Sequence, residues 1–225
     1  MTVQKCHQWR NKMIFPEFKL SIQDVSATRN YQKVFTPVSM VLKNGDSLYI
    51  EGENGAGKTT FLRVISGLNT IYVGDIFLNH VNRKELAHIY NQHILYVGHS
   101  LGLKEDLTAF ENIHALLKIQ GIHASKDGIH AVFDELSIPT QNRAIRFLSA
   151  GQRRRVALSR LWLEHKTLWI LDEPFTALDK RSIDILENAI TNHYQKGGCV
   201  MFTSHQLPSK EVYNLHHIIK SYKKE

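Results

Sequence analysis

One stretch of the chain, Gly52 to Thr60, constrains the fold more than any other. It reads GENGAGKTT and fits G-x-x-x-x-G-K-[ST], the pattern of a phosphate-binding loop. Glycines let the backbone bend tightly and bring its N–H groups against phosphate oxygens. Lys58 adds a compact positive charge, and the Thr59 hydroxyl suits Mg²⁺. The candidate nucleotide-binding residues are therefore Gly52, Glu53, Asn54, Gly55, Ala56, Gly57, Lys58, Thr59 and Thr60.

The flanks of this loop support the same interpretation. Upstream, Ser47 to Ile50 predicts a short buried strand. Downstream, Gly67 is placed to end a helix whose apolar residues recur at helical spacing: Phe61, Leu62, Ile65 and Leu68. An ordinary glycine turn is the alternative, but it requires neither the Lys-Thr pair nor both flanks. A strand, a glycine loop and a helix aim the helix N-terminus at an anion.

Composition limits the class of protein. The chain has 225 residues, 43% of them hydrophobic and 22% charged, which predicts a globular protein with a sizeable core. The net charge of +7 permits nucleic acid or an anionic membrane as a partner. Because the charges are scattered, with short clusters at Arg153–Arg155 and Lys220–Lys224, solvated faces are the preferred interpretation, and no nucleic-acid partner is expected. The 13 histidines show no zinc or haem-attachment spacing, so the chain itself is not expected to hold haem.

The sequence also predicts where the chain works. No run approaches the ~18 apolar residues of a membrane span, and no signal peptide is evident. The expected location is the cytosol or the cytosolic side of a membrane. Cys6 and Cys199 lie far apart in sequence, so no disulfide is expected. The polar segment Met1 to Pro16 is not assigned to the core.

Two further parts of the fold follow from periodicity. Strands before the phosphate loop, at 18–25, 38–42 and after a turn within 30–35, predict a small antiparallel sheet beside the main one, with Lys43 to Asp46 as a hairpin-like turn. Another short strand is expected at 74–79, after the first helix. Another apolar strand, Ile94 to Val97, leads to the loop at His99. Helical spacing in Leu107–Gly121 and Ala131–Leu136 predicts a helical subdomain inserted from about residue 100 to 150, or to about 160 with the helix that follows.

Residues 148–205 carry the remaining candidate chemistry. Leu148 to Gln152 opens a helix that Ser149 can cap. Its buried face is predicted to contain Ala157, Leu158, Leu161 and Trp162, with Arg153, Arg154 and Arg155 in a more exposed part.

Two apolar runs predict parallel strands buried on both faces. Leu168–Leu171 ends in Asp172 and Glu173, which match a Mg²⁺ ligand beside a general base. An isolated Asp-Glu pair more often marks a solvated strand end. Because a phosphate loop is also present, the metal-ligand and general-base roles are preferred here. Cys199–Phe202 leads to His205. A lone histidine there is usually structural, yet ligands bind at the carboxyl ends of such strands.

The order of these motifs resembles the nucleotide-binding subunits of ABC transporters. Residues 52–60 are similar to Walker A, 148–152 to the signature motif, 168–173 to Walker B, 177–179 to the D-loop, and His205 to the switch histidine. The resemblance covers residues 18–215. It implies an α/β fold, a P-loop NTPase of the ABC ATPase type with a mostly parallel core sheet, an antiparallel β subdomain and an inserted helical subdomain. Residues 1–225 are expected to form this single domain.

A narrower resemblance covers three segments. Leu148–Leu163, Leu168–Asp179 and Gly197–Gln206 are similar to the CcmA family, the ATPases of the haem exporter in cytochrome c maturation, system I. Most ABC ATPases have glutamine at the position of His99, whereas the Gly-His pair is similar to the CcmA pattern. The aromatic residue that stacks on adenine falls near Arg29 and Tyr31, and neither is assigned that role.

The resemblance implies a role for each candidate residue. ATP with Mg²⁺ would bind between Walker A of one subunit and the signature motif of the other, in a head-to-tail homodimer. The catalytic residues would be Lys58, Glu173 and His205, with Thr59 and Asp172 holding the metal. The partner would add its signature residues, namely Ser149, Gly151 and Gln152, and His99 would belong to the loop near the γ-phosphate.

The implied partners are integral membrane permease subunits of the haem exporter, similar to CcmB and CcmC. They would dock on residues 100–150 at the cytoplasmic face of the inner membrane, where the subunit is peripheral. The haem would be handled by the complex. Two alternatives stay open: the ATPase of another small-substrate ABC exporter, and a soluble ABC protein. Soluble ABC proteins of the translation type carry two cassettes in one chain, and those of the repair type carry long coiled coils; this sequence shows neither feature. Its architecture does not exclude an iron–sulfur assembly ATPase.

Overall fold

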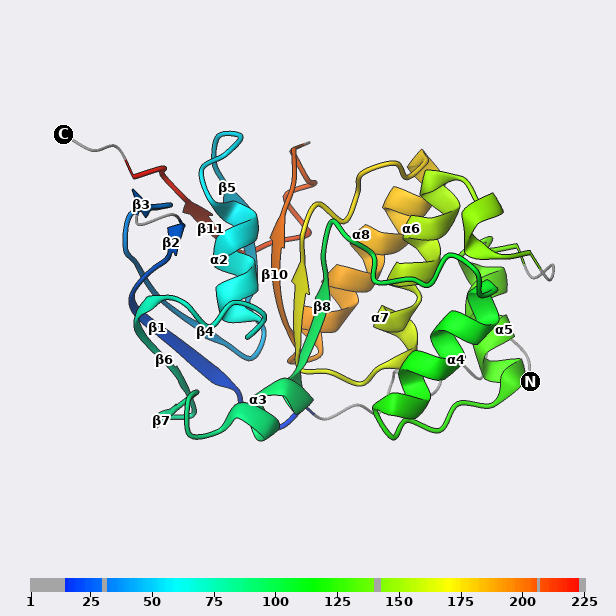
Figure 1. The fold of residues 1–225 in the computed structure, drawn as a ribbon, viewed down its shortest axis with the longest axis horizontal. Coiled ribbons are helices and arrows are strands. Elements are labelled where there is room, and N and C mark those ends of the chain that lie inside the picture. Colours follow the sequence, from blue (N-terminus) through cyan, green and yellow to red (C-terminus); the bar gives the residue numbers. More distant parts are fainter. Residues whose placement is uncertain (1–14, 30–31, 140–142, 206, 223–225) are drawn as a thin grey trace. The chain divides into compact units, whose positions relative to one another are not determined.

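The computed structural model describes residues 15–29, 32–139, 143–205 and 207–222, and these fall into two compact units. The sheet unit comprises the described residues of 15–98, 166–173 and 187–222, and the helical unit comprises those of 99–165 and 174–186. Figure 1 gives the order of the elements along the chain.

An antiparallel sheet with strand order β4-β1-β6-β7 forms one layer of the sheet unit. Its strands are β1 (Lys19–Ser26), β4 (Val38–Lys43), β6 (Val73–Leu78) and β7 (Val81–Asn82). As the alternation predicts, Phe18, Leu20 and Ile22 are all buried on one face. The short strands β2 (Thr28–Arg29) and β3 (Gln32–Lys33) pair as a separate ribbon.

The second layer is a parallel sheet with strand order β11-β5-β10-β9-β8. Its strands are β11 (Leu215–Ile218), β5 (Ser47–Glu51), β10 (Cys199–Thr203), β9 (Leu168–Leu171) and β8 (Ile94–Val97). Every residue of β9 and β10 is buried, which explains their continuous apolar runs. The carboxyl ends of these strands therefore share one edge, where the candidate carboxylates lie.

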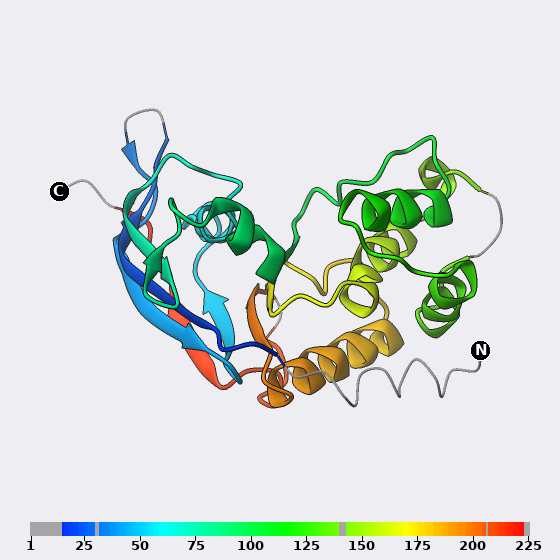
Figure 2. The same cartoon turned by 90° about the horizontal axis from the view of Figure 1, so that it is seen from below.

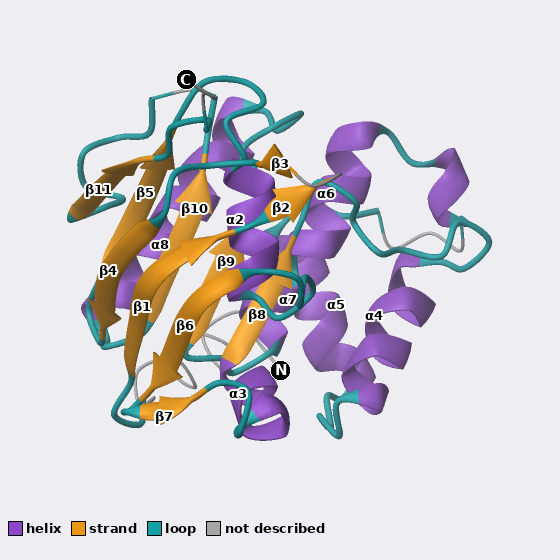
Figure 3. Cartoon of the chain, turned by 60° about the vertical axis from the view of Figure 1, so that its left-hand side comes forward, coloured by secondary structure: helices purple, strands orange, loops and turns teal. Residues whose placement is uncertain are grey.

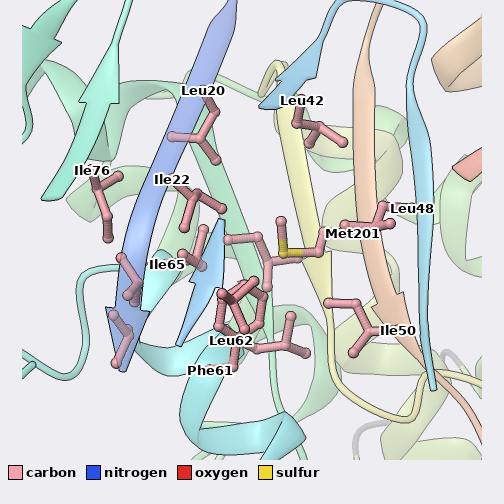
Figure 4. Close-up of a cluster of buried hydrophobic side chains, with 14 of the residues drawn as sticks. Leu20, Ile22, Leu42, Leu48, Ile50, Phe61, Leu62, Ile65, Ile76 and Met201 are labelled. Atoms are coloured by element: carbon pink, nitrogen blue, oxygen red, sulfur yellow. The ribbon is translucent and has the colours of Figure 1, made fainter. Parts of the chain in front are cut away.

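Helix α2 (Lys58–Ile65) lies between the two sheets, as Figures 2 and 3 show from two directions. Its residues Phe61, Leu62 and Ile65 join side chains of both sheets in one hydrophobic cluster (Figure 4). The last carbonyl groups of α2 are also bound. Tyr90 donates its hydroxyl to the Ile65 carbonyl over 2.6 Å, and the Arg83 guanidinium donates to the carbonyl of Val64. These contacts satisfy acceptors that a helix end leaves open.

Two helices complete the sheet unit, α3 (Ala87–His93) and the C-terminal part of α8 (Lys180–Gln195). His193 of α8 stacks on Trp169 of β9 with ring centroids 3.7 Å apart. Cys199 is a buried free cysteine, and burial raises its pKa to about 12. Cys6 lies outside the described residues.

The helical unit has its own core. Its helices are α4 (Ala109–Ile119), α5 (Lys126–Glu135), α6 (Ala150–Leu158), α7 (Arg160–Leu163) and the 3₁₀ turn Ile145–Phe147, with the N-terminal part of α8. Apolar side chains of α4, α5 and α6 form the cluster, among them Ile113, Phe133 and Val156. No helix among the described residues has the length and apolar character needed to cross a bilayer.

Four sequence predictions were wrong. Within the turn and strand expected at 30–35, β3 pairs with β2 and does not join the antiparallel sheet. The turn at 43–46 is not a hairpin, because β4 belongs to the antiparallel sheet and β5 to the parallel sheet. Leu68 does not continue the buried face of α2, because the helix ends before Gly67, whose φ is +84°, and Leu68 is 58% exposed. Arg154 is buried, and its Nε donates to the Pro174 carbonyl over 3.4 Å.

Neighbouring residues of β4 test the packing of the two layers. Leu42 is fully buried, whereas Val41 is 50% exposed on the other face. We expect Leu42→Ala to lower the free energy of unfolding by ~2–5 kcal/mol, because it leaves a cavity in the core. Val41→Ala should change it by less than about 0.5 kcal/mol. Urea unfolding of both variants measures the difference, and equal losses would contradict the assigned faces.

Candidate functional site

The phosphate-binding loop connects β5 to α2, and its glycines are sterically required. Gly57 has φ +98°, and a Cβ there would lie 2.8 Å from Val34 Cγ1 and 2.9 Å from Phe35 Cδ1. A Cβ at Gly52 would lie 2.5 Å from the carbonyl oxygen of Ile219. The backbone is therefore packed so closely that only glycine fits at these positions.

Lys58 is held inside the curve of this loop. Its ammonium donates to the carbonyl oxygens of Gly52, over 2.6 Å, and Glu53, over 3.2 Å, and the residue is 8% exposed. Carbonyl oxygens bind an ammonium without neutralising its charge. The loop thus combines a fixed cation with the N-terminus of α2, which suits a phosphate group.

Two segments 113 residues apart meet at Asp172, directly after β9. The Thr59 hydroxyl donates to Asp172 Oδ1 over 3.1 Å, and the Thr203 hydroxyl donates to the same oxygen over 3.0 Å. Asp172 is 1% exposed. A hydroxyl and a carboxylate are the hard oxygen ligands that Mg²⁺ prefers, so Thr59 and Asp172 fit the metal expected here.

Glu173 is held by three contacts. Its N–H donates to Thr203 Oγ1 over 2.9 Å, and its Oε2 accepts from the His205 N–H over 2.9 Å. Its Oε1 lies 3.5 Å from His205 Nε2. Glu173 adopts φ +52°, a left-handed conformation that non-glycine residues rarely take and that is typical of functional sites. The structure thus brings together two of the predicted catalytic residues, Glu173 and His205.

The signature residues lie in the helical unit at the start of α6. Ser149 caps this helix by accepting from the Gln152 N–H over 3.2 Å, and the Gln152 side chain accepts from the Ser149 N–H over 2.8 Å. A Cβ at Gly151 would lie 2.5 Å from the Ala177 carbonyl oxygen. The helix start is therefore packed against the loop at Ala177, which itself has φ +64°.

An ion pair ties the same helix to the D-loop. Arg155 Nη1 lies 3.4 Å from Asp179 Oδ2. Asp179 also accepts from the Ser182 N–H over 2.8 Å, at the start of α8. The pKa of Asp179 is lowered, first by this backbone hydrogen bond and then by the Ser182 hydroxyl, with smaller contributions from Arg155 and Arg181.

Not every candidate residue joins one cluster. Lys58, Thr59, Asp172, Glu173 and His205 all belong to the sheet unit, whereas Ser149, Gly151, Gln152 and the exposed His99 belong to the helical unit. Among the residues near the expected adenine site, Tyr31 and the side chain of Arg29 lie outside the described part.

Sequence reasoning missed Thr203, which contacts both carboxylate residues. The sequence shows only a polar residue at the end of an apolar strand, and the pairing of β10 with β9 is what brings it beside Asp172.

Comparison with known proteins places these features in a family context. The model of the ABC transporter family matches residues 35–176. The cytochrome c biogenesis ATP-binding export protein CcmA of Haemophilus influenzae is 37% identical over 214 residues, which cover 94% of this chain and all of that protein. The protein of the same name from Aliivibrio fischeri is 41% identical over 191 residues, covering 83% of this chain and 92% of the relative.

Solved structures share the fold. An ABC transporter ATP-binding protein from Pyrococcus furiosus has a TM-score of 0.77 at 22% identity, covering 91% of this chain and all of that one. The ATP-binding cassette MJ0796 was solved as a dimer in a post-hydrolysis state with ADP and Pi. It has a TM-score of 0.74 at 22% identity, and the match covers 89% of this chain and 94% of that one. The α/β architecture predicted from the sequence is thereby confirmed.

The cap of α6 gives a test that is independent of activity. Ser149→Ala removes the acceptor of the Gln152 N–H, and loss of a cap costs about 1 kcal/mol. We expect amide hydrogen exchange in the first turn of α6 to become about fivefold faster. Ser125 caps α5 by accepting from the Gly128 N–H, so Ser125→Ala is the matched control. It should accelerate exchange in α5 and leave the first turn of α6 unchanged; the reverse pattern would reject the cap.

Proposed function

Because the chain belongs to the ABC transporter ATP-binding proteins, and within them to the CcmA family, we propose that it hydrolyses ATP at the end of its parallel sheet. The observation that carries this proposal is the meeting of the phosphate loop with Asp172, Glu173 and His205 in one unit. The reaction is hydrolysis of the bond between the β- and γ-phosphates of ATP.

The chain's own groups bind the triphosphate. The N–H groups of the phosphate loop and the N-terminus of α2 donate to the phosphate oxygens, and Lys58 offsets negative charge that develops on the transferred phosphoryl group. Thr59 and Asp172 would hold Mg²⁺, which, when bound, neutralises charge on the β- and γ-phosphates. The hydrogen bond between these two side chains supports the assignment.

Glu173 is the proposed general base. A carboxylate at this position accepts a proton from the attacking water, or orients it, and His205 contacts the γ-phosphate. Their proximity supports both roles: the His205 N–H fixes one carboxylate oxygen of Glu173, while the imidazole lies 3.5 Å from the other. The contacts with His205 thus orient the carboxylate of Glu173.

The functional form we propose is a head-to-tail homodimer of one ABC ATPase domain, residues 1–225. Ser149, Gly151 and Gln152 of one subunit would complete the ATP site of the other, and His99 would belong to the loop near the γ-phosphate. Support comes from the fold shared with a cassette that was solved as a dimer. The capped start of α6 gives the signature residues a defined conformation from which to bind phosphate.

The biological role we propose is energy supply to a haem exporter in c-type cytochrome biogenesis. Support comes from relatives up to 41% identical that carry the name cytochrome c biogenesis ATP-binding export protein. The partners would be permease subunits similar to CcmB and CcmC, docked on residues 100–150, with the ATPase peripheral at the cytoplasmic face of the inner membrane. The same similarity argues against another small-substrate exporter or an iron–sulfur assembly ATPase.

Two substitutions separate binding from hydrolysis. Glu173→Gln keeps the shape of the side chain and removes the base, so ATP should bind normally while turnover falls at least ~10²-fold. In gel filtration with Mg·ATP, this variant should accumulate as a dimer.

Lys58→Ala is the matched comparison, because it removes the cation of the phosphate loop and should weaken ATP binding itself. Nucleotide binding measured by fluorescence and phosphate release measured on the same samples distinguish the two effects. Turnover like wild type in the Glu173→Gln protein would exclude Glu173 as the base.

The proposed biological role has its own test in the native host. A host that carries only the Glu173→Gln protein should lack mature c-type cytochromes, because haem delivery requires ATP, whereas b-type cytochromes should persist. Haem-stained gels measure the first, and reduced-minus-oxidised spectra of membranes measure the second. Normal c-type cytochromes would reject the haem-exporter role and leave the ATPase assignment intact.

A further inference from the structure

Thr203 is the one polar residue of β10, whose other residues are Cys199, Val200, Met201 and Phe202, and it is fully buried. Within the parallel pairing of β10 with β9, Phe202 lies beside Leu171. The next residue along each strand brings Thr203 beside Asp172, at the edge where the carboxylates gather. A valine would fill the same space without a hydroxyl, so packing alone does not require threonine.

The direction of both hydrogen bonds of Thr203 is fixed by chemistry. An ionised carboxylate only accepts, so the Thr203 hydroxyl must donate to Asp172 Oδ1, 3.0 Å away. The hydroxyl oxygen of Thr203 in turn accepts the N–H of Glu173 over 2.9 Å. One hydroxyl therefore binds the proposed metal ligand through its proton and the proposed base through its lone pair.

The second of these bonds holds a strained backbone. At φ +52°, Glu173 is in a conformation that costs a non-glycine residue energy and persists only when its surroundings enforce it. The bond from its N–H to Thr203 fixes the peptide before Glu173, and the His205 N–H fixes the carboxylate. Without the Thr203 hydroxyl, the partly buried N–H of Glu173 would lose this acceptor and the turn would be free to relax.

We propose that Thr203 is a positioning residue for ATP hydrolysis, which couples the orientation of the metal-binding carboxylate of Asp172 to that of the base Glu173. The proposal rests on the proposed function for its catalytic meaning. Thr59 also donates to Asp172 Oδ1, but it is itself a proposed metal ligand. The role we propose for Thr203 at this oxygen is to orient the carboxylate.

The test compares three variants of the full-length chain. Thr203→Val removes the hydroxyl and keeps the shape, and Thr203→Ser keeps the hydroxyl. Thr167→Val is the control, because it makes the same chemical change in another buried threonine, which is 4% exposed. Thr167 comes directly before the first residue of β9, at the end of the strand away from Asp172, and its hydroxyl lies 3.4 Å from His93 Nδ1. Thermal unfolding of each variant without nucleotide provides the baseline for a merely structural effect.

Two kinds of readout are measured on every variant. The first, without nucleotide or metal, is the exchange rate of the Glu173 amide hydrogen by NMR. Thr203→Val should accelerate it about tenfold or more, and Thr203→Ser should not. The second is ATP hydrolysis as a function of ATP and Mg²⁺. Thr203→Val should lower kcat about tenfold or more and raise the Mg²⁺ concentration for half-maximal rate, with KM for ATP little changed.

The outcomes separate this proposal from the proposed function. The positioning role is supported if Thr203→Ser restores kcat and the Glu173 exchange rate, and if Thr167→Val keeps wild-type kcat although it is as destabilised as Thr203→Val. Wild-type kcat and Mg²⁺ dependence in Thr203→Val, equal loss of kcat in both valine variants, or an unchanged Glu173 exchange rate would each overturn it. If the wild-type protein neither bound nor hydrolysed ATP, the proposed function would fail, and the amide exchange would still decide whether Thr203 holds Glu173.

Discussion

The site depends on one carboxylate oxygen, Asp172 Oδ1, which accepts hydrogen bonds from Thr59 and Thr203. These three residues belong to three separate segments: the start of α2, the end of β9 and the end of β10. A buried carboxylate is costly unless it is bound by donors, so the hydrogen bonds from these segments favour their meeting in this arrangement. The parallel register of β9 and β10 and the position of α2 between the sheets are what allow both hydroxyls to reach it.

Sequence predicted the elements that carry the site because their signals are local. A phosphate loop between an apolar strand and a helix, and Asp172 with Glu173 after an apolar run, are patterns that do not depend on distant residues. The capping box of α6 is equally local, because Ser149 and Gln152 are three residues apart. The strand, loop and helix around residues 52–60, the buried strand before Asp172 and the Ser149 cap were confirmed, as was an antiparallel sheet that contains β1 and β4.

The predictions were wrong where strand pairing or burial depends on contacts between residues that are distant in sequence. A turn between two strands looks the same whether the strands pair with each other or with different sheets, so the sequence of residues 43–46 could not exclude a hairpin. Arg154 was expected in a more exposed part of its helix, but it is buried and its Nε donates to the carbonyl of Pro174. The hydroxyl of Thr203 gained its partners only through strand order, which periodicity does not encode.

The two ends of α2 are held by different kinds of group, and this has a mechanical consequence. Its first turn faces the phosphate loop, whereas its last carbonyl groups are bound by the Arg83 guanidinium and the Tyr90 hydroxyl. Burial raises the pKa of Tyr90 well above its usual value, so that hydroxyl keeps its proton throughout the physiological range. The Arg83 and Tyr90 side chains therefore oppose movement of α2 along its axis, and they do so at the end that lies farthest from the phosphate loop.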